Sequence, residues 1–250
     1  MRGSDRSRIV RRTGPGPSAP GTVEVLRRFR KEKDDPEPFY LAIAARTVDG
    51  FAFPLESRRV LDLGAGPGYY STALADAGAH VVALEQAELT PIPAVPGIIA
   101  DGARLPFSTA SFDGVFCSNV LEHTPDTAAL IAEIERILRP GGWAWISWTN
   151  WWSPWGGHAI TPLHYLGPRL GLATWRRLFG EPKGRNIPFR NLWPTTIAGV
   201  MGQVRQRSGM LLLDALPRYY PSQRRITRVP LLREVATWNC LLLIERARED

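Results

Sequence analysis

The sequence predicts an α/β fold built on a mostly parallel sheet with helices on both faces. The main observation is an apolar, β-branched run over 59–63 that breaks into three alternating glycines and then enters a helix-compatible segment. A second run, 80–84, is apolar throughout, as in strands that helices cover on both faces. An amphipathic helix predicted over 126–138 lies between two further apolar runs. Strands and helices therefore alternate along the chain, which is typical of a parallel α/β sheet.

Length and composition allow one domain of this kind. The chain has 250 residues, of which 44% are hydrophobic and 10% aromatic, enough for one sizeable core with an excursion. We expect a single domain over 21–250. The preceding segment, 1–20, mixes Arg, Ser, Gly and Pro and has too little apolar surface to offset its ordering entropy, which predicts a disordered basic arm.

Excess positive charge is concentrated near the ends of the chain. The net charge is +7 and the isoelectric point is near 9.9. The arginines that contribute most are Arg2, Arg6, Arg8, Arg11 and Arg12 in front and Arg218, Arg224, Arg225, Arg228 and Arg233 behind. Basic ends can bind nucleic acid or an anionic membrane. They are also common as solvated surface, and this simpler interpretation is favoured.

Cysteine usage and hydropathy indicate a reducing compartment and no membrane span. Cys117 and Cys240 lie within apolar, strand-like runs, which favours buried thiols over a disulfide. No spacing of cysteine or histidine matches a zinc site, so no metal is expected. The basic N-terminus lacks the apolar stretch of a secretory signal, and no apolar run approaches the length of about 18 residues that spans a bilayer. We therefore expect a cytoplasmic protein.

The remaining elements follow from the same patterns. Two helices are expected within 21–56, one over 22–33 and one from near Pro36 through Val48. The elements expected after 59–63 are a helix at 70–77, strands at 80–84, 98–100 and 114–118, the helix at 126–138, a strand at 143–148 and closing strands at 211–216 and 237–244. A proline-rich loop, 90–97, replaces a crossover helix, and a basic loop is expected over 217–230, where Tyr219 and Tyr220 can touch a substrate.

The glycine turn at 64–68 distinguishes between two classes of cofactor. A dinucleotide fingerprint requires glycine at the sixth position of G-x-G-x-x-G, where this chain has Tyr69. Pro67 also removes a backbone donor that could hold a pyrophosphate. A nicotinamide dehydrogenase is therefore disfavoured. Asp62 stands two residues before the first glycine, and the turn with this acid resembles motif I (hhDhGxGxG) of the class I S-adenosylmethionine (SAM)-dependent methyltransferases.

Further segments match this family in order and interval. They are Glu85 after the second strand, Asp101-Gly102-Ala103 continuing to Phe107, Asn119 through His123, and Ile137 through Gly142 before the fifth strand. Together with motif I they cover about 57–150. The acid that follows Asp62 by 23 positions is close to the interval of about 20 at which a carboxylate binds ribose hydroxyls in nucleotide-binding units. A surface glutamate is the alternative for Glu85, and an Asx turn explains part of the 101–103 segment.

The resemblance implies a Rossmann-like, seven-stranded sheet, SAM as cofactor, and a set of contacts along the ends of the strands. In such a protein Glu85 binds the ribose, and the segment 101–103 borders the adenine. The cofactor-binding residues implied are Asp62, Gly64, Ala65, Gly66, Gly68, Glu85, Asp101, Gly102, Ala103, Ser118, Asn119 and Tyr40. Tyr40 enters this set because helices before the first strand often close over the cofactor in this family; a core aromatic is the alternative. The proline-broken linker at 90–97 departs from the family pattern and makes the ribose and adenine walls less certain.

Residues 149–208 form an aromatic-rich insertion after the fifth strand. In this fold the insertion falls above the carboxyl ends of the strands, where ligands bind. An aromatic cover suits a small, partly apolar acceptor, and a satellite core packing its own aromatics is the alternative. His158 and His123 are the candidate catalytic residues. His158 suits a base because histidine exchanges protons near neutral pH, and a structural histidine is the alternative. His123 stands where many members of the family have a histidine, which can contact the substrate or cap the next helix. His164 is a further candidate base, and its distance of six residues from His158 does not suggest a metal pair.

The expected function is methyl transfer from SAM to a small-molecule acceptor, such as a lipid-like, polyketide or glycosidic metabolite. A nucleic-acid methyltransferase is the first alternative, using the basic ends on phosphates. Against it, the chain has no Asn/Asp-Pro-Pro-Tyr-type motif, no paired catalytic cysteines and no appended RNA-binding module. A protein that binds SAM without turnover is the second. The oligomeric state and the identity of the acceptor do not follow from the sequence.

Overall fold

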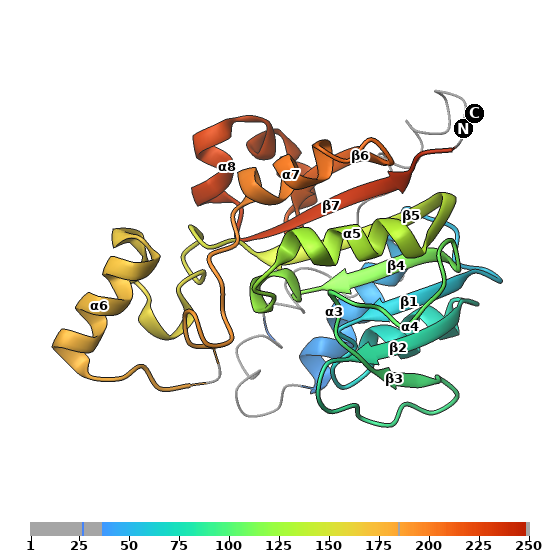
Figure 1. Ribbon diagram of the computed structural model, residues 1–250, viewed down its shortest axis with the longest axis horizontal. Helices are drawn as coiled ribbons and strands as arrows, with labels where there is room; N and C mark the ends of the chain where they lie inside the picture. Colours follow the sequence, from blue (N-terminus) through green and yellow to red (C-terminus); the bar gives the residue numbers. More distant parts are fainter. Residues whose placement is uncertain (1–26, 28–36, 185, 249–250) are drawn as a thin grey trace.

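A single seven-stranded sheet organises the protein (Figure 1). The computed structural model describes residues 27, 37–184 and 186–248. The disordered arm expected at 1–20 and most of the helix expected at 22–33 lie outside these residues. The strands are β1 (Arg59–Leu63), β2 (His80–Glu85), β3 (Gly97–Ile99), β4 (Phe112–Ser118), β5 (Leu138–Thr149), β6 (Met210–Pro217) and β7 (Asn239–Arg246).

The order of the strands is β3-β2-β1-β4-β5-β7-β6, and only β7 runs antiparallel to its neighbours. This confirms the predicted fold class, a Rossmann-like and mostly parallel sheet. Because β6 is antiparallel to β7, it runs in the same direction as β5. The C-terminal ends of β1 to β6 therefore meet at one edge of the sheet, which we call the carboxyl edge.

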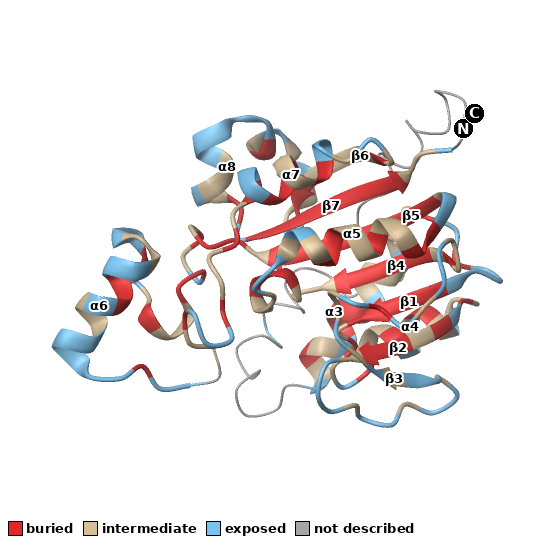
Figure 2. Cartoon of the chain, viewed as in Figure 1, coloured by how far each residue is buried: buried red, intermediate tan, exposed pale blue. Residues whose placement is uncertain are grey.

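Helices cover both faces of the sheet, as predicted. On one face α5 (Thr127–Ile137) and α7 (Ile197–Arg205) bury their apolar side chains against the strands. On the other face lie α4 (Tyr69–Asp76) and, beside it, α3 (Glu37–Asp49). Figure 2 shows the buried residues concentrated in the strands and the inward sides of these helices. Asp126 caps α5 by accepting a hydrogen bond from the Ala129 amide at 2.9 Å, which explains where that helix begins.

The fifth strand starts earlier than predicted. The turn at Arg139–Gly142 was expected to separate helix from strand, but β5 begins at Leu138, which pairs with Phe112 of β4. The regular pairing resumes with Trp143 opposite Gly114, so the intervening residues form an irregularity within the strand. Gly141 has a φ of +78°, a conformation that glycine adopts without strain.

The prediction of a loop over 217–230 was wrong. This segment contains the short helix η4 (Pro221–Arg228) and leads into α8 (Pro230–Ala236), while β7 starts at Asn239. Both helices have proline in their first turn, where the missing N–H is not required and the fixed φ favours the helix. Proline is typical of loops, but here it marks the start of two helices.

The insertion forms an arm with its own small core. It contains η2 (His158–Ile160), η3 (Leu163–Leu166) and α6 (Pro168–Phe179), and Figure 1 shows α6 projecting beyond the carboxyl edge. The hydrophobic cluster of this core consists of Trp151, Ile160, Leu172 and Leu192. The last part of the segment, α7, instead packs in the main core. The linker between β2 and β3 contains no helix, as its prolines predict. No described helix is long and apolar enough to cross a membrane.

Candidate functional site

The three glycines of the turn after β1 all have left-handed backbone, with φ of +79° at Gly64, +54° at Gly66 and +86° at Gly68. A Cβ at Gly64 would come within 2.3 Å of the Val120 side chain, and one at Gly68 within 2.4 Å of Ile92. A Cβ at Gly66 would instead meet no atom within 4 Å. Two glycines are therefore required by close packing. Gly66, the middle one, instead faces open space, which leaves room for a ligand to lie against the turn.

Glu85 lies beside this turn. Its Oε1 accepts a hydrogen bond from the Gly66 amide at 2.5 Å, and Oε2 accepts one from the Gln86 amide at 3.3 Å. The side chain is half-buried at the carboxyl end of β2, so the fold brings together the acid and the glycine turn that the sequence separates by 19 positions. A carboxylate here can accept hydrogen bonds from the hydroxyl groups of a sugar.

Asp62 lies beneath the turn, not at its surface. Its side chain is buried, and Oδ2 accepts a hydrogen bond from the Ser71 hydroxyl at 2.6 Å, which ties α4 to β1. Burial raises the pKa of Asp62 from 3.8 to about 7, and the negative charge of Glu85 adds to the rise while the Ser71 hydrogen bond opposes it. Asp62 thus positions the start of α4, and its charge is linked to that of Glu85.

The segment after β3 forms an Asx turn at the next position along the edge. The Asp101 Oδ1 accepts a hydrogen bond from the Ala103 amide at 2.9 Å. Gly102 packs tightly, since a Cβ there would lie 2.7 Å from Leu130. The Ala100 amide donates to the Glu85 carbonyl at 2.9 Å, so this turn follows directly on the strand paired with β2. The exposed Asp101 and the half-buried Glu85 therefore line neighbouring strand ends.

Ser118 and Asn119 end β4 at the same edge. The Asn119 amide donates to the Ser147 carbonyl at 2.8 Å, and its Oδ1 accepts a hydrogen bond from the Asn239 side chain at 2.7 Å. Asn119 has a φ of +57°, which asparagine tolerates better than most residues. The backbone consequently turns sharply after β4 and leads into η1 (Leu121–His123).

Arg218 occupies the centre of this edge, and sequence reasoning did not select it for the site. Its Nη1 donates to the hydroxyls of Ser118 and Ser147 at 2.9 and 3.0 Å, and its Nη2 donates to the hydroxyl of Tyr70. The guanidinium also lies over the Trp145 ring, 4.8 Å from its centroid. Arg218 thus connects the end of β6 with β4, β5 and α4. Arg218 and Ser118 are 100 positions apart in the sequence, so no local sequence pattern predicts their contact.

Glu122 anchors the insertion to the sheet and was also not selected. Its carboxylate accepts a hydrogen bond from the Thr149 amide at 2.8 Å, and its carbonyl accepts one from the Trp193 amide at 2.7 Å. The side chain is buried, and desolvation raises its pKa. The second carboxylate oxygen has no hydrogen-bond partner among the described residues.

Tyr40 of α3 lies near the glycine turn. Its ring stacks on Tyr69, the first residue of α4, with centroids 5.9 Å apart and an angle of 2° between the planes. Because Tyr69 directly follows Gly68, the described helix before the first strand borders the region where the sequence places the cofactor.

The two candidate histidines come together from different segments and have opposite tautomers. The His123 Nδ1 lies 2.6 Å from the Asn191 carbonyl, which only accepts, so Nδ1 carries a proton and, in the neutral ring, Nε2 has the lone pair. The His158 Nδ1 lies 3.2 Å from the Asn186 amide nitrogen, which donates, so the proton of His158 is on Nε2.

Burial, with a smaller contribution from the positive charges of the nearby His123 and His164, lowers the pKa of His158 from 6.5 to about 4. The His158 ring is consequently neutral at physiological pH. Its Nε2 is buried and has no partner among the described residues. His164 differs, because it is fully buried and donates from Nε2 to the Ser153 carbonyl at 3.0 Å. This contact makes His164 part of the arm's own packing.

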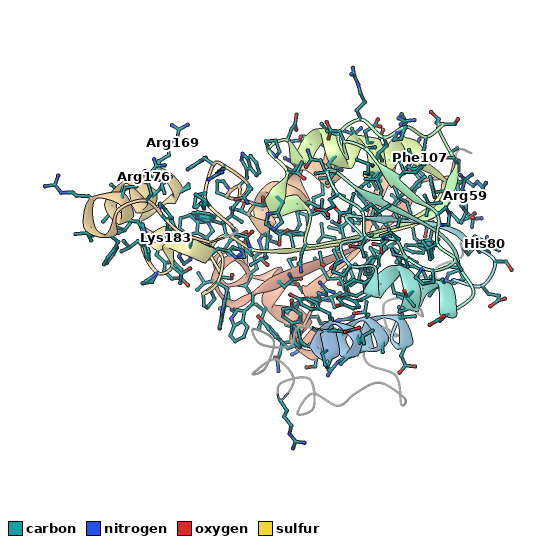
Figure 3. All side chains as sticks on the ribbon, turned by 90° about the horizontal axis from the view of Figure 1, so that it is seen from below. Arg59, His80, Phe107, Arg169, Arg176 and Lys183 are labelled. Carbon is teal, nitrogen blue, oxygen red and sulfur yellow. The ribbon has the colours of Figure 1, made fainter. Side chains whose placement is uncertain are left out.

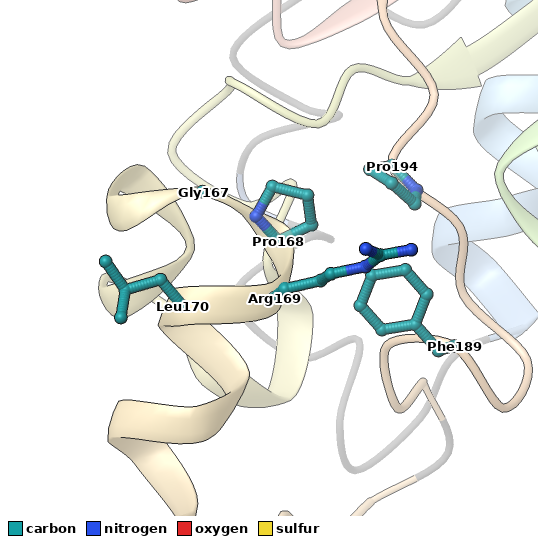
Figure 4. Close-up of a pocket in the computed structure, with 6 residues that line it drawn as sticks. All are labelled: Gly167, Pro168, Arg169, Leu170, Phe189 and Pro194. Atoms are coloured by element: carbon teal, nitrogen blue, oxygen red, sulfur yellow. The ribbon is translucent and has the colours of Figure 1, made fainter.

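A cavity of about 440 Å³ lies on the arm, lined by Gly167, Pro168, Arg169, Leu170, Phe189 and Pro194 (Figure 4). None of these residues is among those gathered at the glycine turn. Figure 3 shows Arg169, Arg176 and Lys183 at this end of the molecule, opposite Arg59 and His80, which begin β1 and β2. The arm therefore lies beyond the carboxyl edge of the sheet. The described residues include no cluster of metal ligands.

Comparison with known proteins places this arrangement in context. Residues 61–146 match the family model described as a methyltransferase domain. A protein of Mycobacterium avium named "uncharacterized methyltransferase" is 36% identical over 241 residues, covering 90% of this chain and 94% of its own. A protein of the same name from Mycobacteroides abscessus is 34% identical over 245 residues, covering 89% and 93%.

Solved structures show the same fold. A SAM-dependent methyltransferase from Mesorhizobium loti superposes with a TM-score of 0.55 at 21% identity, covering 83% of this chain and 98% of its own. A protein from Thermotoga maritima, described as a SAM-dependent methyltransferase and possible histamine N-methyltransferase, gives 0.54 at 15% identity, covering 91% and 100%. At these identities the likeness concerns the fold.

Proposed function

This chain belongs to the class I SAM-dependent methyltransferases, and we propose that its acceptor is a small molecule bound between the carboxyl edge and the arm. It is a methyltransferase, and SAM is its cofactor. The proposal on the acceptor includes lipid-like, polyketide and glycosidic metabolites. The observation that carries it is the pair of histidines, because His123 comes from η1 after β4, His158 comes from the arm, and the Nε2 of His158 is buried. A ligand that reaches a buried nitrogen must be small or present a slender end.

The residues at the edge fit SAM. Glu85 supplies a carboxylate for the ribose hydroxyls, and the open space at Gly66 admits a ligand against the turn. We propose that the cofactor-binding set is the glycine turn from Gly64 to Gly68 with Asp62 beneath it, Glu85, residues 101–103, Ser118 and Asn119, with Tyr40 covering it. SAM supplies an electrophilic methyl group. The protein's task is then to hold an acceptor in line with that group, and positioning of this kind contributes on the order of 7–11 kcal/mol.

The tautomers give the two histidines different roles in this proposal. His123 presents a lone pair on Nε2, while the Asn191 carbonyl holds its other nitrogen, so it is placed to take a proton from an acceptor hydroxyl or ammonium. His158 presents an N–H and is placed to donate a hydrogen bond to the same acceptor. Because its pKa is lowered, His158 stays neutral. When His123 takes the proton and becomes positively charged, it therefore has no second positive ring beside it.

Replacing His123 with alanine is expected to lower kcat at least about 100-fold, because general-base assistance typically contributes a factor of about 10² to 10⁴. The dissociation constant for SAM, measured by calorimetry, should stay unchanged. His80→Ala is the matched control, since His80 is exposed at the opposite edge. A kcat equal to that of the control variant would remove His123 from the proton transfer.

Replacing His158 with alanine is expected to raise KM about tenfold with little change in kcat, as expected for the loss of one hydrogen bond to the acceptor. Because the pKa of His158 is about 4, its ring should also stay neutral from about pH 5.5 to 8 in the wild type, which NMR of the imidazole resonances measures. Protonation of this ring near pH 6.5 would show that it is not desolvated as described.

Incubation with methyl-labelled SAM and an extract of the organism that encodes the protein tests the class of acceptor. Label is expected in the low-mass fraction, and mass spectrometry of that fraction identifies the product. Label confined to nucleic acid, with activity lost steeply as salt rises, would replace this proposal with the nucleic-acid alternative.

A further inference from the structure

Helix α8 has its polar side turned inward and its apolar side turned outward. The Glu234 carboxylate accepts hydrogen bonds from the Ile197 and Ala198 amides at 3.0 and 2.7 Å and pairs with Arg233 at 3.4 Å. These contacts fix the helix against the start of α7. No residue of α8 is fully buried. The helix is therefore attached through a charged residue, which is the reverse of an ordinary surface helix.

The outward side is strongly apolar. Leu231 is 85% exposed, and the neighbouring exposed side chains are Val229, Leu232, Val235 and Trp238. Trp238 contacts Trp155 of the insertion, with ring centroids 4.6 Å apart, and Trp155 is exposed as well. Contiguous apolar surface of this kind marks a docking site, because it is costly to leave in water. Tryptophan is also a typical residue of the boundary between water and lipid.

Exposed positive charge adjoins this apolar surface, because η4 packs against α8. The segment 218–238 contains five arginines and one acid, and that acid is Glu234, already held by α7. Arg224 and Arg233 pair with Asp214 and Glu234. Arg225 and Arg228 are exposed, and neither lies within 4.0 Å of a carboxylate of the described residues, although the positive charge of Arg228 is near enough to Asp214 to lower the pKa of that carboxyl. We call this surface, with Val229, Leu231, Leu232, Val235, Trp238, Arg225 and Arg228, the α8 face.

The α8 face borders the carboxyl edge. The segment from β6 to β7 starts with Arg218, which contacts Ser118, and ends at Asn239, which contacts Asn119. The Trp238 carbonyl accepts a hydrogen bond from the Asn150 amide at 3.1 Å, so the face also adjoins the start of the insertion. Figure 1 shows α8 at the end of the sheet from which α6 projects. Whatever docks on the α8 face lies next to the opening of the proposed acceptor site.

We propose that the α8 face docks on an anionic lipid surface, with its leucines and Trp238 among the acyl chains and its arginines on the headgroups. The combination of exposed leucine, tryptophan and arginine matches the boundary of a negatively charged bilayer. A second copy of the chain is a poorer partner, because a two-fold contact would bring the same arginines of both copies together. Phosphates of nucleic acid would satisfy the arginines but leave the leucines in water. The docked orientation presents the acceptor opening to the lipid, although docking itself requires no methyl transfer.

Co-sedimentation of the full chain with vesicles tests this proposal without SAM or acceptor. Vesicles of phosphatidylcholine and phosphatidylglycerol in equal parts should bind the protein, whereas vesicles of phosphatidylcholine alone should bind it far more weakly. Binding should fall as salt rises, because headgroup attraction is screened. The arginines of the N-terminal segment remain in every variant, so differences between variants report on the α8 face.

Two double variants locate the contact. Arg225→Gln with Arg228→Gln should lower the partition coefficient on mixed vesicles about fivefold for each arginine removed. Leu231→Gln with Leu232→Gln should lower it by about tenfold or more, since each leucine loses its burial among acyl chains. Both changes are at exposed positions, so the melting temperature should be unaffected.

Matched controls are available elsewhere on the chain. Arg205→Gln removes an exposed arginine at the end of α7, away from the carboxyl edge, and Leu178→Gln removes a leucine of α6 that is 60% exposed. Both should bind as the wild type does. Absence of binding to mixed vesicles, or binding that survives both double variants, would overturn the proposal. A dimer in sedimentation velocity that Leu231→Gln with Leu232→Gln converts to a monomer, without vesicle binding, would assign the face to a second copy instead.

Discussion

Replacing Glu85 with alanine is expected to raise the dissociation constant for SAM at least about 30-fold. The carboxylate lies at the end of β2, beside the glycine turn, and offers two acceptor oxygens to a ribose with two hydroxyls. Hydrogen bonds to a charged group contribute about 1.5–3 kcal/mol each, so losing both has a large effect on affinity. Isothermal calorimetry with SAM and with S-adenosylhomocysteine measures the change for both forms of the nucleoside.

Glu88→Ala is the control for this experiment, because Glu88 is an exposed acid three positions further along the same loop. The control should bind SAM as tightly as the wild type. Glu85→Ala should also keep its fold, although the Gly66 amide loses its partner, and circular dichroism checks this. Unchanged affinity in a folded Glu85→Ala protein would show that the ribose lies elsewhere.

Replacing Asp62 with asparagine is expected to stabilise the cofactor-free protein at alkaline pH. Burial raises the pKa of this carboxyl to about 7 in the folded chain, against 3.8 for an ordinary aspartate. Between about pH 4 and pH 7 the folded chain keeps a proton that the unfolded chain releases. The free energy of unfolding therefore falls as pH rises through this window, by up to about 4 kcal/mol in total. Asparagine cannot ionise, so it removes this loss and still accepts the hydrogen bond from Ser71.

Urea denaturation measures this effect. The free energy of unfolding of Asp62→Asn minus that of the wild type should be about 2–3 kcal/mol larger at pH 8 than at pH 5. Asp76→Asn is the control, because Asp76 is an exposed acid at the end of the same helix, α4. An equal difference between wild type and Asp62→Asn at both pH values would mean that Asp62 is not desolvated as the structure indicates.

Much of the cofactor side was predictable because its signals are local. The glycines, Asp62 and Glu85 lie within one strand–helix–strand unit, and a unit of this size has only one favourable handedness. Strand 59–63 was predicted with the bounds that β1 has. The Asx turn at Asp101 and the helix cap at Asp126 likewise depend on neighbours within three positions.

Errors occurred where a local signal had two meanings. Proline at positions 221 and 230 was read as loop, but it stands in the first turn of η4 and of α8. Pro140 and its glycines were read as a break before β5, but pairing with Phe112 extends that strand back to Leu138. Tertiary pairing and packing decided both cases, and neither is encoded in the adjacent residues.

The sequence alone determined the sheet, the family and the glycine turn with its acid, because these depend on contacts within short segments. Tertiary structure alone decided which residues share the carboxyl edge. Arg218 reaches Ser118 across 100 positions, and the carbonyl of Asn191, 68 positions away, selects the tautomer of His123. Tertiary structure also decided that the apolar side of α8 faces outward, because Glu234 accepts its hydrogen bonds from the amides at the start of α7. Long-range contacts of this kind leave no periodic pattern in the sequence, so they can be identified only once the positions of the strands are known.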